Sequence, residues 1–120
     1  MTGDSTFART QALRDLIALD RPLDDAVAAL QEFTWKSDEV LAVLTRSDAA
    51  RVLSSYLNGA FSAEEVQKWA ETLEDRHDLG LEPAAEGLLK TCLFELSTLP
   101  LFQQLTREVA LEWMRRLAVR

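Results

Sequence analysis

Residues 56–82 restrict the fold of this chain more than any other segment. Asn58-Gly59 predicts the end of a helix, because both residues accept the left-handed backbone conformation that closes helices. Ser62 and Glu65 then have the spacing of a capping box, in which each side chain bonds to the backbone amide of the other residue. One helix therefore ends and a second begins at once, and a charged turn follows within the same 27 residues.

The capped helix has one apolar side and one charged side. Its apolar residues recur at intervals of three and four positions, as expected for a helix that lies on a core: Val66, Trp69, Ala70 and Leu73. Charged residues occupy the positions expected to point outward: Glu64, Lys68, Glu71 and Asp75. The same periodicity recurs along most of the chain, and no alternating strand pattern extends beyond a few residues.

Prolines and caps predict the other helix boundaries. The first helix is expected over residues 6–19, and a second opens at Pro22 and ends before a turn at residues 34–36. Three residues are expected to be N-caps of later helices: Ser37, Ser47 and Thr106. Pro83 should open the central helix and Pro100 should stop it.

These boundaries predict an all-α fold. The short helix after Ser37 should carry four apolar residues: Val40, Leu41, Val43 and Leu44. The whole chain, residues 1–120, should form a single-domain bundle of about six to seven helices with short loops, after a flexible tail at residues 1–5. Hydrophobic content of 48% with 28% charged residues agrees with a folded domain rather than a disordered one.

Charge and hydropathy narrow the classes of partner. The net charge is −7, so the surface should repel nucleic acid and anionic lipid, which bind clustered Lys and Arg. No apolar run approaches the roughly 18 residues that a bilayer span needs, and the first ten residues lack the apolar core of a signal peptide. The single cysteine, Cys92, excludes an internal disulfide and suits a reducing compartment. We therefore expect a cytoplasmic protein.

The sequence contains no pattern typical of catalysis or cofactor binding. There is no Gly-rich phosphate loop, no nucleophile elbow and no pair of His on one helix face. One histidine, His77, among the carboxylates of Glu74, Asp78 and Glu82 is a poor match to a zinc site, so these acids are interpreted as a solvated helix end. Cys92 lies on an apolar stripe and is expected to be a buried, inert thiol. We expect a protein without enzymatic activity, cofactor or metal.

The three tryptophans differ in their expected roles. Trp69 and Trp113 fall on apolar helix faces and should be buried in the core. Trp35 falls in the turn between two helices, where it either plugs the end of the bundle or anchors a partner, since tryptophan is enriched in both settings.

Negative charge is concentrated in one part of the chain. Eight acids and two bases, Lys68 and Arg76, lie between Ser62 and Glu86, whereas residues 101–120 have a net charge of +2. Surface helices are often charged, and net charge keeps proteins soluble, so a solvated face is one interpretation. Like charges gathered on one helix also cost stability, so a basic partner that relieves their repulsion is the other.

From about Leu23 onward the chain resembles a family of small, acidic, helical bacterial proteins. The residues that carry the resemblance are Phe33-Thr34-Trp35, Tyr56-Leu57-Asn58-Gly59, Ser62-Ala63-Glu64-Glu65-Val66, Trp69-Ala70, Leu73-Glu74, Arg76-His77-Asp78, Leu93-Phe94-Glu95-Leu96 and Leu105-Thr106. That family is similar to the immunity proteins of contact-dependent growth inhibition and other polymorphic toxin systems. The resemblance implies a cytosolic antitoxin-like protein that neutralises one cognate toxin, often a nuclease, by covering its active site or its substrate surface.

The charge pattern and the resemblance lead to one hypothesis. An acidic helix could occupy the basic cleft of a nuclease toxin as a mimic of phosphates. The acids expected to face the toxin are Glu64, Glu71, Glu74, Asp75, Asp78 and Glu82. Trp35 and His77 are the candidate anchors. The alternatives are a non-catalytic adaptor or regulatory domain with an apolar groove, a phage-type inhibitor that uses the same mimicry, and a small enzyme with a polar pocket.

Overall fold

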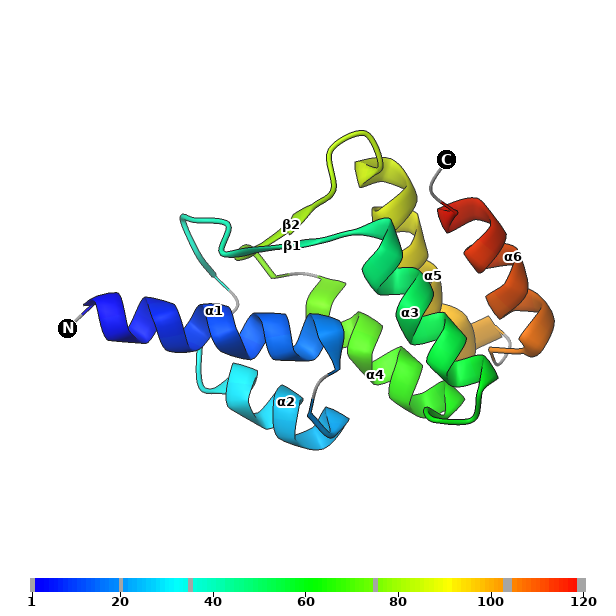
Figure 1. Ribbon diagram of the computed structural model, residues 1–120, viewed down its shortest axis with the longest axis horizontal. Coiled ribbons are helices and arrows are strands. Elements are labelled where there is room, and N and C mark those ends of the chain that lie inside the picture. Colours follow the sequence, from blue (N-terminus) through cyan, green and yellow to red (C-terminus); the bar gives the residue numbers. More distant parts are fainter. Residues whose placement is uncertain (1, 20, 35, 75, 103–104, 119–120) are drawn as a thin grey trace.

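The computed structural model describes residues 2–19, 21–34, 36–74, 76–102 and 105–118, without the side chains of residues 2–5 and 99–102. Within these ranges the chain forms six α-helices and two short β-strands (Figure 1). The helices are α1 (Thr2–Ala18), α2 (Leu23–Gln31), α3 (Arg46–Leu57), α4 (Ala63–Glu74), α5 (Glu86–Phe102) and α6 (Arg107–Leu117). The strands are β1 (Ala42–Leu44) and β2 (Leu79–Leu81). The prediction of a mostly helical fold is confirmed.

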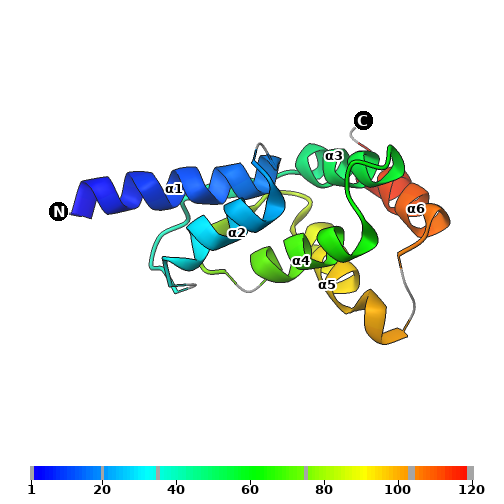
Figure 2. The same ribbon diagram turned by 90° about the horizontal axis from the view of Figure 1, so that it is seen from below.

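The helices pack in pairs. α1 lies against α2 at one end of the molecule, whereas α4 packs on α5 and α3 packs on α6 at the other end (Figures 1 and 2). α4 also contacts α2 and α3, so it connects the two ends. The two strands lie beside α1, above it in Figure 1, and α1 packs against β1.

The core contains two tryptophans, as the sequence predicts. Trp69 has no exposed surface, and its indole N–H donates a hydrogen bond of 3.0 Å to the backbone oxygen of Leu16. Trp113 is also buried, and its indole N–H donates to the carboxylate of Glu95. Each buried indole therefore keeps a hydrogen-bond partner, which removes the cost of burying an unsatisfied N–H group.

Capping residues fix the ends of the helices. The capping box of α4 is confirmed, since Glu65 N donates to Ser62 Oγ at 3.1 Å and Ser62 N donates to the Glu65 carboxylate at 2.9 Å. Thr106 caps α6 as expected. The N-cap predicted at Ser47 is wrong: α3 begins after Thr45, which forms a capping box with Asp48. That box satisfies two backbone N–H groups, whereas Ser47 followed by Asp48 lacks the required spacing.

The short helix predicted after Ser37 does not exist. Val43 and Leu44 instead belong to β1, and Val40 and Leu41 directly precede it. β1 pairs in parallel with β2 through Ala42↔Leu79, Val43↔Gly80 and Leu44↔Leu81. Instead, the Ser37 hydroxyl donates to Glu39 O at 2.7 Å and accepts from Glu39 N at 3.1 Å. A short apolar run does not separate strand from helix by periodicity, and here a distant second strand decides between them.

Two proline-based boundaries also differ from the prediction. α5 begins at Glu86 rather than at Pro83, because a turn intervenes in which Ala85 N donates to Glu82 O at 3.1 Å. At the other end α5 continues through Pro100 to Phe102. Proline lacks a backbone N–H, so α5 continues there without the hydrogen bond that position 100 would donate one turn back. α1 likewise begins at Thr2, within the segment expected to be a flexible tail.

Two glycines provide a matched test of the backbone geometry. Gly59 follows α3 with φ of +84°, whereas Gly87 lies in the first turn of α5, and an added Cβ would meet no atom within 4 Å at either site. We expect Gly59→Ala to lower the free energy of unfolding by about 1 kcal/mol, because an L side chain is strained at positive φ. Gly87→Ala should raise it by about 0.5 kcal/mol through helix propensity.

Urea unfolding followed by circular dichroism measures both changes. Since neither substitution creates a clash, changes of the same sign in the two variants would contradict the assigned conformation of Gly59.

Candidate functional site

The acids predicted to form one face are divided between the surface and the interior. Glu64 and Glu71 are exposed on the outer side of α4, and His77 is exposed in the turn that follows α4. Glu74 and Glu82 are half-buried, and Asp78 has no exposed surface. The candidate residues Trp35 and Asp75 lie outside the described part of the chain.

Asp78 is buried between two arginines. Its Oδ2 accepts hydrogen bonds from Arg9 Nε at 2.8 Å and from an Arg76 terminal nitrogen at 3.0 Å, and its Oδ1 accepts from Arg76 Nε at 2.9 Å. The two guanidinium groups also converge on Thr34 O, at 2.7 Å from Arg9 and 3.1 Å from Arg76. Arg9 additionally donates to Lys36 O at 2.7 Å. These residues form a polar junction of α1, the α2–β1 loop and the turn before β2.

The prediction that Asp78 faces a partner is therefore wrong. Burial by itself would raise the pKa of Asp78, but the hydrogen bonds from Arg76 and Arg9 outweigh it and hold the pKa of that carboxyl below its usual value. Its backbone oxygen also accepts from Leu41 N at 2.8 Å, immediately before β1. Asp78 acts inside the fold, where it connects segments that are far apart in sequence.

Glu82 also makes its main contacts within the chain. Its carboxylate accepts from the backbone N of Arg46 at 2.8 Å and from two side-chain nitrogens of Arg46 at 2.8 and 3.2 Å. These side-chain and backbone hydrogen bonds hold the pKa of Glu82 below its usual value. Since Arg46 is the first residue of α3, the carboxylate lies at the positive end of that helix and joins it to β2.

Glu74 accepts a hydrogen bond of 2.8 Å from the hydroxyl of Ser97 on α5. It therefore links α4 to α5 while keeping part of its surface exposed. Of the predicted acids in the described part of the chain, Glu64 and Glu71 are the ones that make no hydrogen bond or ion pair with another described segment.

Other acids extend the surface of α4, and sequence analysis did not include them in the site. α2 and α4 contact each other, and Lys68 Nζ on α4 lies 3.8 Å from an Asp24 carboxylate oxygen on α2. The exposed acids of the two helices, together with Glu32 at the C-cap of α2, are Asp24, Asp25, Glu32, Glu64 and Glu71. We call these five residues, with Lys68 among them, the α2–α4 acidic face. In the sequence, the positive end of a helix dipole is enough to explain Asp24 and Asp25. Nothing in that pattern indicates that α2 lies next to α4.

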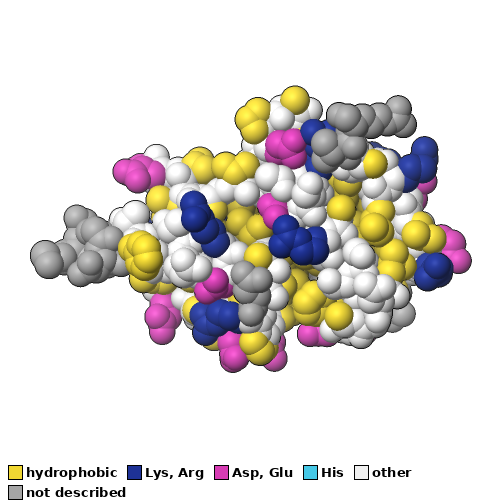
Figure 3. All heavy atoms as spheres, in the orientation of Figure 1, with side chains coloured by type: hydrophobic (Ala, Val, Ile, Leu, Met, Phe, Trp, Pro, Cys, Tyr) yellow, Lys and Arg dark blue, Asp and Glu magenta, His cyan; other side chains and the backbone are white. Residues whose placement is uncertain are grey.

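The broad face seen in Figure 1 has a different character. There, acidic and basic side chains are interspersed and apolar patches lie between them (Figure 3). Of the side chains that the structure describes, five large apolar ones are exposed to 44% or more: Phe7, Val40, Val43, Phe94 and Leu111.

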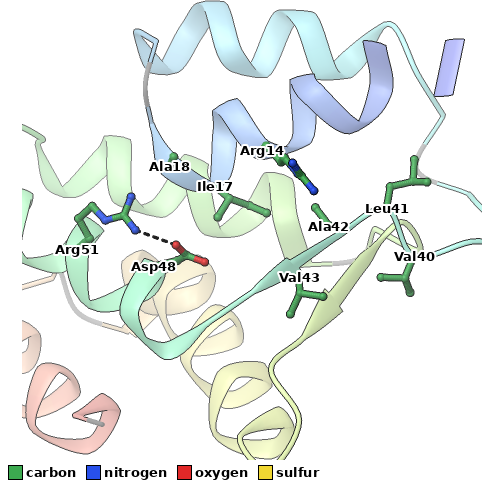
Figure 4. Close-up of a pocket in the computed structure, with 9 residues that line it drawn as sticks. All are labelled: Arg14, Ile17, Ala18, Val40, Leu41, Ala42, Val43, Asp48 and Arg51. Carbon is green, nitrogen blue, oxygen red and sulfur yellow. Dashed lines mark hydrogen bonds and ion pairs between the residues drawn. The ribbon is translucent and has the colours of Figure 1, made fainter. Parts of the chain in front are cut away.

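Two hollows accompany the exposed apolar residues. One, of about 570 Å³, lies between α1, β1 and the start of α3, and Val40 and Val43 are among the residues that line it (Figure 4). The other, of about 350 Å³, lies between β2 and α5 and includes Phe94 and Lys90. Within the described ranges, no group of three or more His, Cys, Asp or Glu is placed to hold a metal ion.

Comparison of the chain with known protein families, curated proteins and solved structures finds no match. The resemblance to immunity proteins therefore stays a prediction from the residues quoted above. None of the helices in the described part of the chain is long and apolar enough to span a bilayer.

Removal of the Asp78 charge should destabilise the fold and change its response to acid. Asp78→Asn leaves two nearly buried guanidinium groups without their carboxylate, so we expect a loss of about 3 kcal/mol in the free energy of unfolding at pH 7. Because the pKa of Asp78 is lowered by folding, its contribution is present above the unfolded value and is lost as the pH falls through the folded value. As the pH is lowered from about 5 to about 2, the free energy of unfolding should therefore decrease less for the variant than for the wild type.

Glu71→Gln is the matched control, since it removes an exposed carboxylate and should change stability by less than about 0.5 kcal/mol. Urea unfolding across this pH range measures both variants. A loss at pH 7 as small for Asp78→Asn as for the control would contradict the buried junction.

The thiol of Cys92 should be unreactive in the folded protein. Burial, with a smaller contribution from the Glu95 carboxylate, raises the pKa of the Cys92 thiol to about 12, so little thiolate exists at neutral pH. A chromogenic disulfide reagent at pH 8 should react with Cys92 only after denaturant is added. Rapid reaction of the native protein would show that this part of α5 is accessible.

Proposed function

We propose that this protein is a non-catalytic binding domain that neutralises another protein, as an immunity protein neutralises its toxin, by holding a basic surface on the α2–α4 acidic face. The observation that carries the proposal is the clustering of exposed acids on two adjacent helices, joined at the contact between Lys68 and Asp24. The contact between Lys68 and Asp24 brings the first turn of α2 beside α4. It adds Asp24 and Asp25 to the exposed acids Glu64 and Glu71.

Electrostatics explains how such a face would act. Exposed carboxylates attract a basic surface over several ångströms and raise the association rate, and salt weakens this attraction. A nuclease presents a basic cleft to nucleic acid, so an acidic helical face can compete with phosphates for it. The buried stripe of α4, which includes Trp69 and Leu73, fixes that helix on the core and keeps its charged side outward.

An adaptor domain is the second candidate function, and Phe94 favours it. This side chain is 59% exposed beside the hollow between β2 and α5, where Leu79, Leu81 and Leu93 provide apolar surface. An exposed aromatic beside an apolar hollow is typical of a site that receives an apolar side chain of a partner. Phe94→Ala would weaken partner binding in this case, and charge reversal on α4 would not.

Charge reversal tests the primary proposal. The variant Asp24→Lys/Glu64→Lys/Glu71→Lys changes the acidic face, and Glu39→Lys/Glu86→Lys/Glu108→Lys changes three exposed acids elsewhere by the same net charge. Both triples alter acids in the first turn of two helices, so their effects on helix dipoles are matched. The wild-type protein is immobilised, partners are captured from a lysate of the organism that encodes it, and association rates of the purified partner are measured.

At low salt the first triple should slow association about tenfold or more, and the control triple should change it less than about threefold. The wild-type rate should fall as salt is raised. Co-expression of the captured partner should inhibit bacterial growth, with rescue by the wild type and not by the first triple. Equal rates for the two triples, or a captured partner that has no toxicity, would contradict the proposal.

A further inference from the structure

Among the residues that the structure describes, one edge of strand β1 has no paired strand. In the described part of the chain, the sheet contains only β1 and β2. Ala42 N donates to Asp78 O and Leu44 O accepts from Glu82 N, so the backbone groups of Ala42 and Leu44 point toward β2. Backbone groups of successive residues in a strand point to opposite edges, so the N–H and C=O of Val43 point away from β2. A further strand could pair with them.

A hollow follows this edge. Four consecutive residues line it from the strand side, Val40 to Val43, and Arg14, Ile17 and Ala18 of α1 and Asp48 and Arg51 of α3 complete it. In Figure 4, Arg14 and Ile17 lie on one side of β1, and Val40 and Val43 project on the other side. A strand placed along the edge would therefore have α1 beside one row of its side chains and the exposed valines beside the other row.

The charges on the α1 side favour an acidic occupant. Arg14 is exposed and makes no hydrogen bond or ion pair with any other residue that the structure describes. Arg51 is 55% exposed and pairs with Asp48 at 2.9 Å at the α3 end of the hollow. The hollow therefore carries one excess positive charge in a chain of net charge −7. On the opposite row, Val40 and Val43 are 58% and 46% exposed and can receive apolar side chains.

We propose that the free edge of β1 binds an extended segment of a partner protein in which acidic and apolar residues alternate. The segment would add a third strand beside Val43, with its acidic side chains on the α1 side near Arg14 and its apolar side chains beside Val40 and Val43. Backbone hydrogen bonds would supply affinity, and the two rows of side chains would select the alternating pattern. This site uses none of the residues of the α2–α4 acidic face, so its test is independent of the test of the function proposed above.

Capped six-residue peptides are suitable probes. One alternates glutamate with valine, and its counterpart alternates lysine with valine. Each is titrated to about 1 mM into the ¹⁵N-labelled full chain. The glutamate peptide should give saturable shifts centred on the Val43 amide, with an affinity at least fivefold higher than that of the lysine peptide. Methylation of alternate peptide nitrogens should abolish binding, because it removes the donors that a third strand needs.

Variants separate this site from general charge effects. Arg14→Glu should reverse the preference between the two peptides. Lys90 is the matched control, because it is exposed beside the hollow between β2 and α5, away from the free edge of β1. Lys90→Glu should leave the preference between the two peptides unchanged. The Asp24→Lys/Glu64→Lys/Glu71→Lys variant should still bind the glutamate peptide through Val43.

Several results would overturn the proposal. No saturable shift at Val43, shifts centred on another surface, or equal affinity of Arg14→Glu for the two peptides would each exclude this occupant. Sedimentation of the free protein as a dimer that Arg14→Glu dissociates would assign the edge to a second copy of the chain instead.

Discussion

The buried carboxylate of Asp78 is the interaction on which the arrangement of this small domain depends. Through it, Arg9 of α1 and Arg76 after α4 meet, and both also hold the backbone oxygen of Thr34 in the α2–β1 loop. The backbone oxygen of the same residue accepts from Leu41 at the start of the strand pair. Charged groups in an interior are costly unless hydrogen bonds compensate for the lost water. Here each of the two guanidinium groups bonds to the Asp78 carboxylate and to a backbone carbonyl.

This junction also explains why charge counted along the sequence overstates the charge of a surface. Asp78 and Glu82 belong to the most acidic part of the chain, yet Arg9 and Arg46 neutralise them from positions 69 and 36 residues away. Exposed acids that are distant in sequence come together instead where α2 contacts α4, at Lys68 and Asp24. The α2–α4 acidic face and the excess positive charge of the hollow beside β1 are thus both products of tertiary packing.

Local signals in the sequence predicted much of the fold. The Ser62–Glu65 capping box, the Thr106 cap, the glycine end of α3 and the buried Trp69 and Trp113 depend on neighbouring residues, so short windows were sufficient. The strand pair could not be found in this way, because Val43 opposes Gly80 across 37 residues of chain. The α2–α4 face was missed for the same reason, whereas Glu64 and Glu71 were placed correctly by helical periodicity alone.

The buried state of Asp78 can be measured directly. Carboxyl ¹³C chemical shifts, followed by NMR through an acid titration of the folded protein, report the pKa of each aspartate. Asp78 should titrate clearly below the usual aspartate value of about 3.9, because Arg76 and Arg9 stabilise its charged form more than burial destabilises it. Titration of Asp78 at the usual value, with shifts like those of a solvent-exposed carboxylate, would contradict the junction. Asp78 would then be an exposed acid that can face a partner.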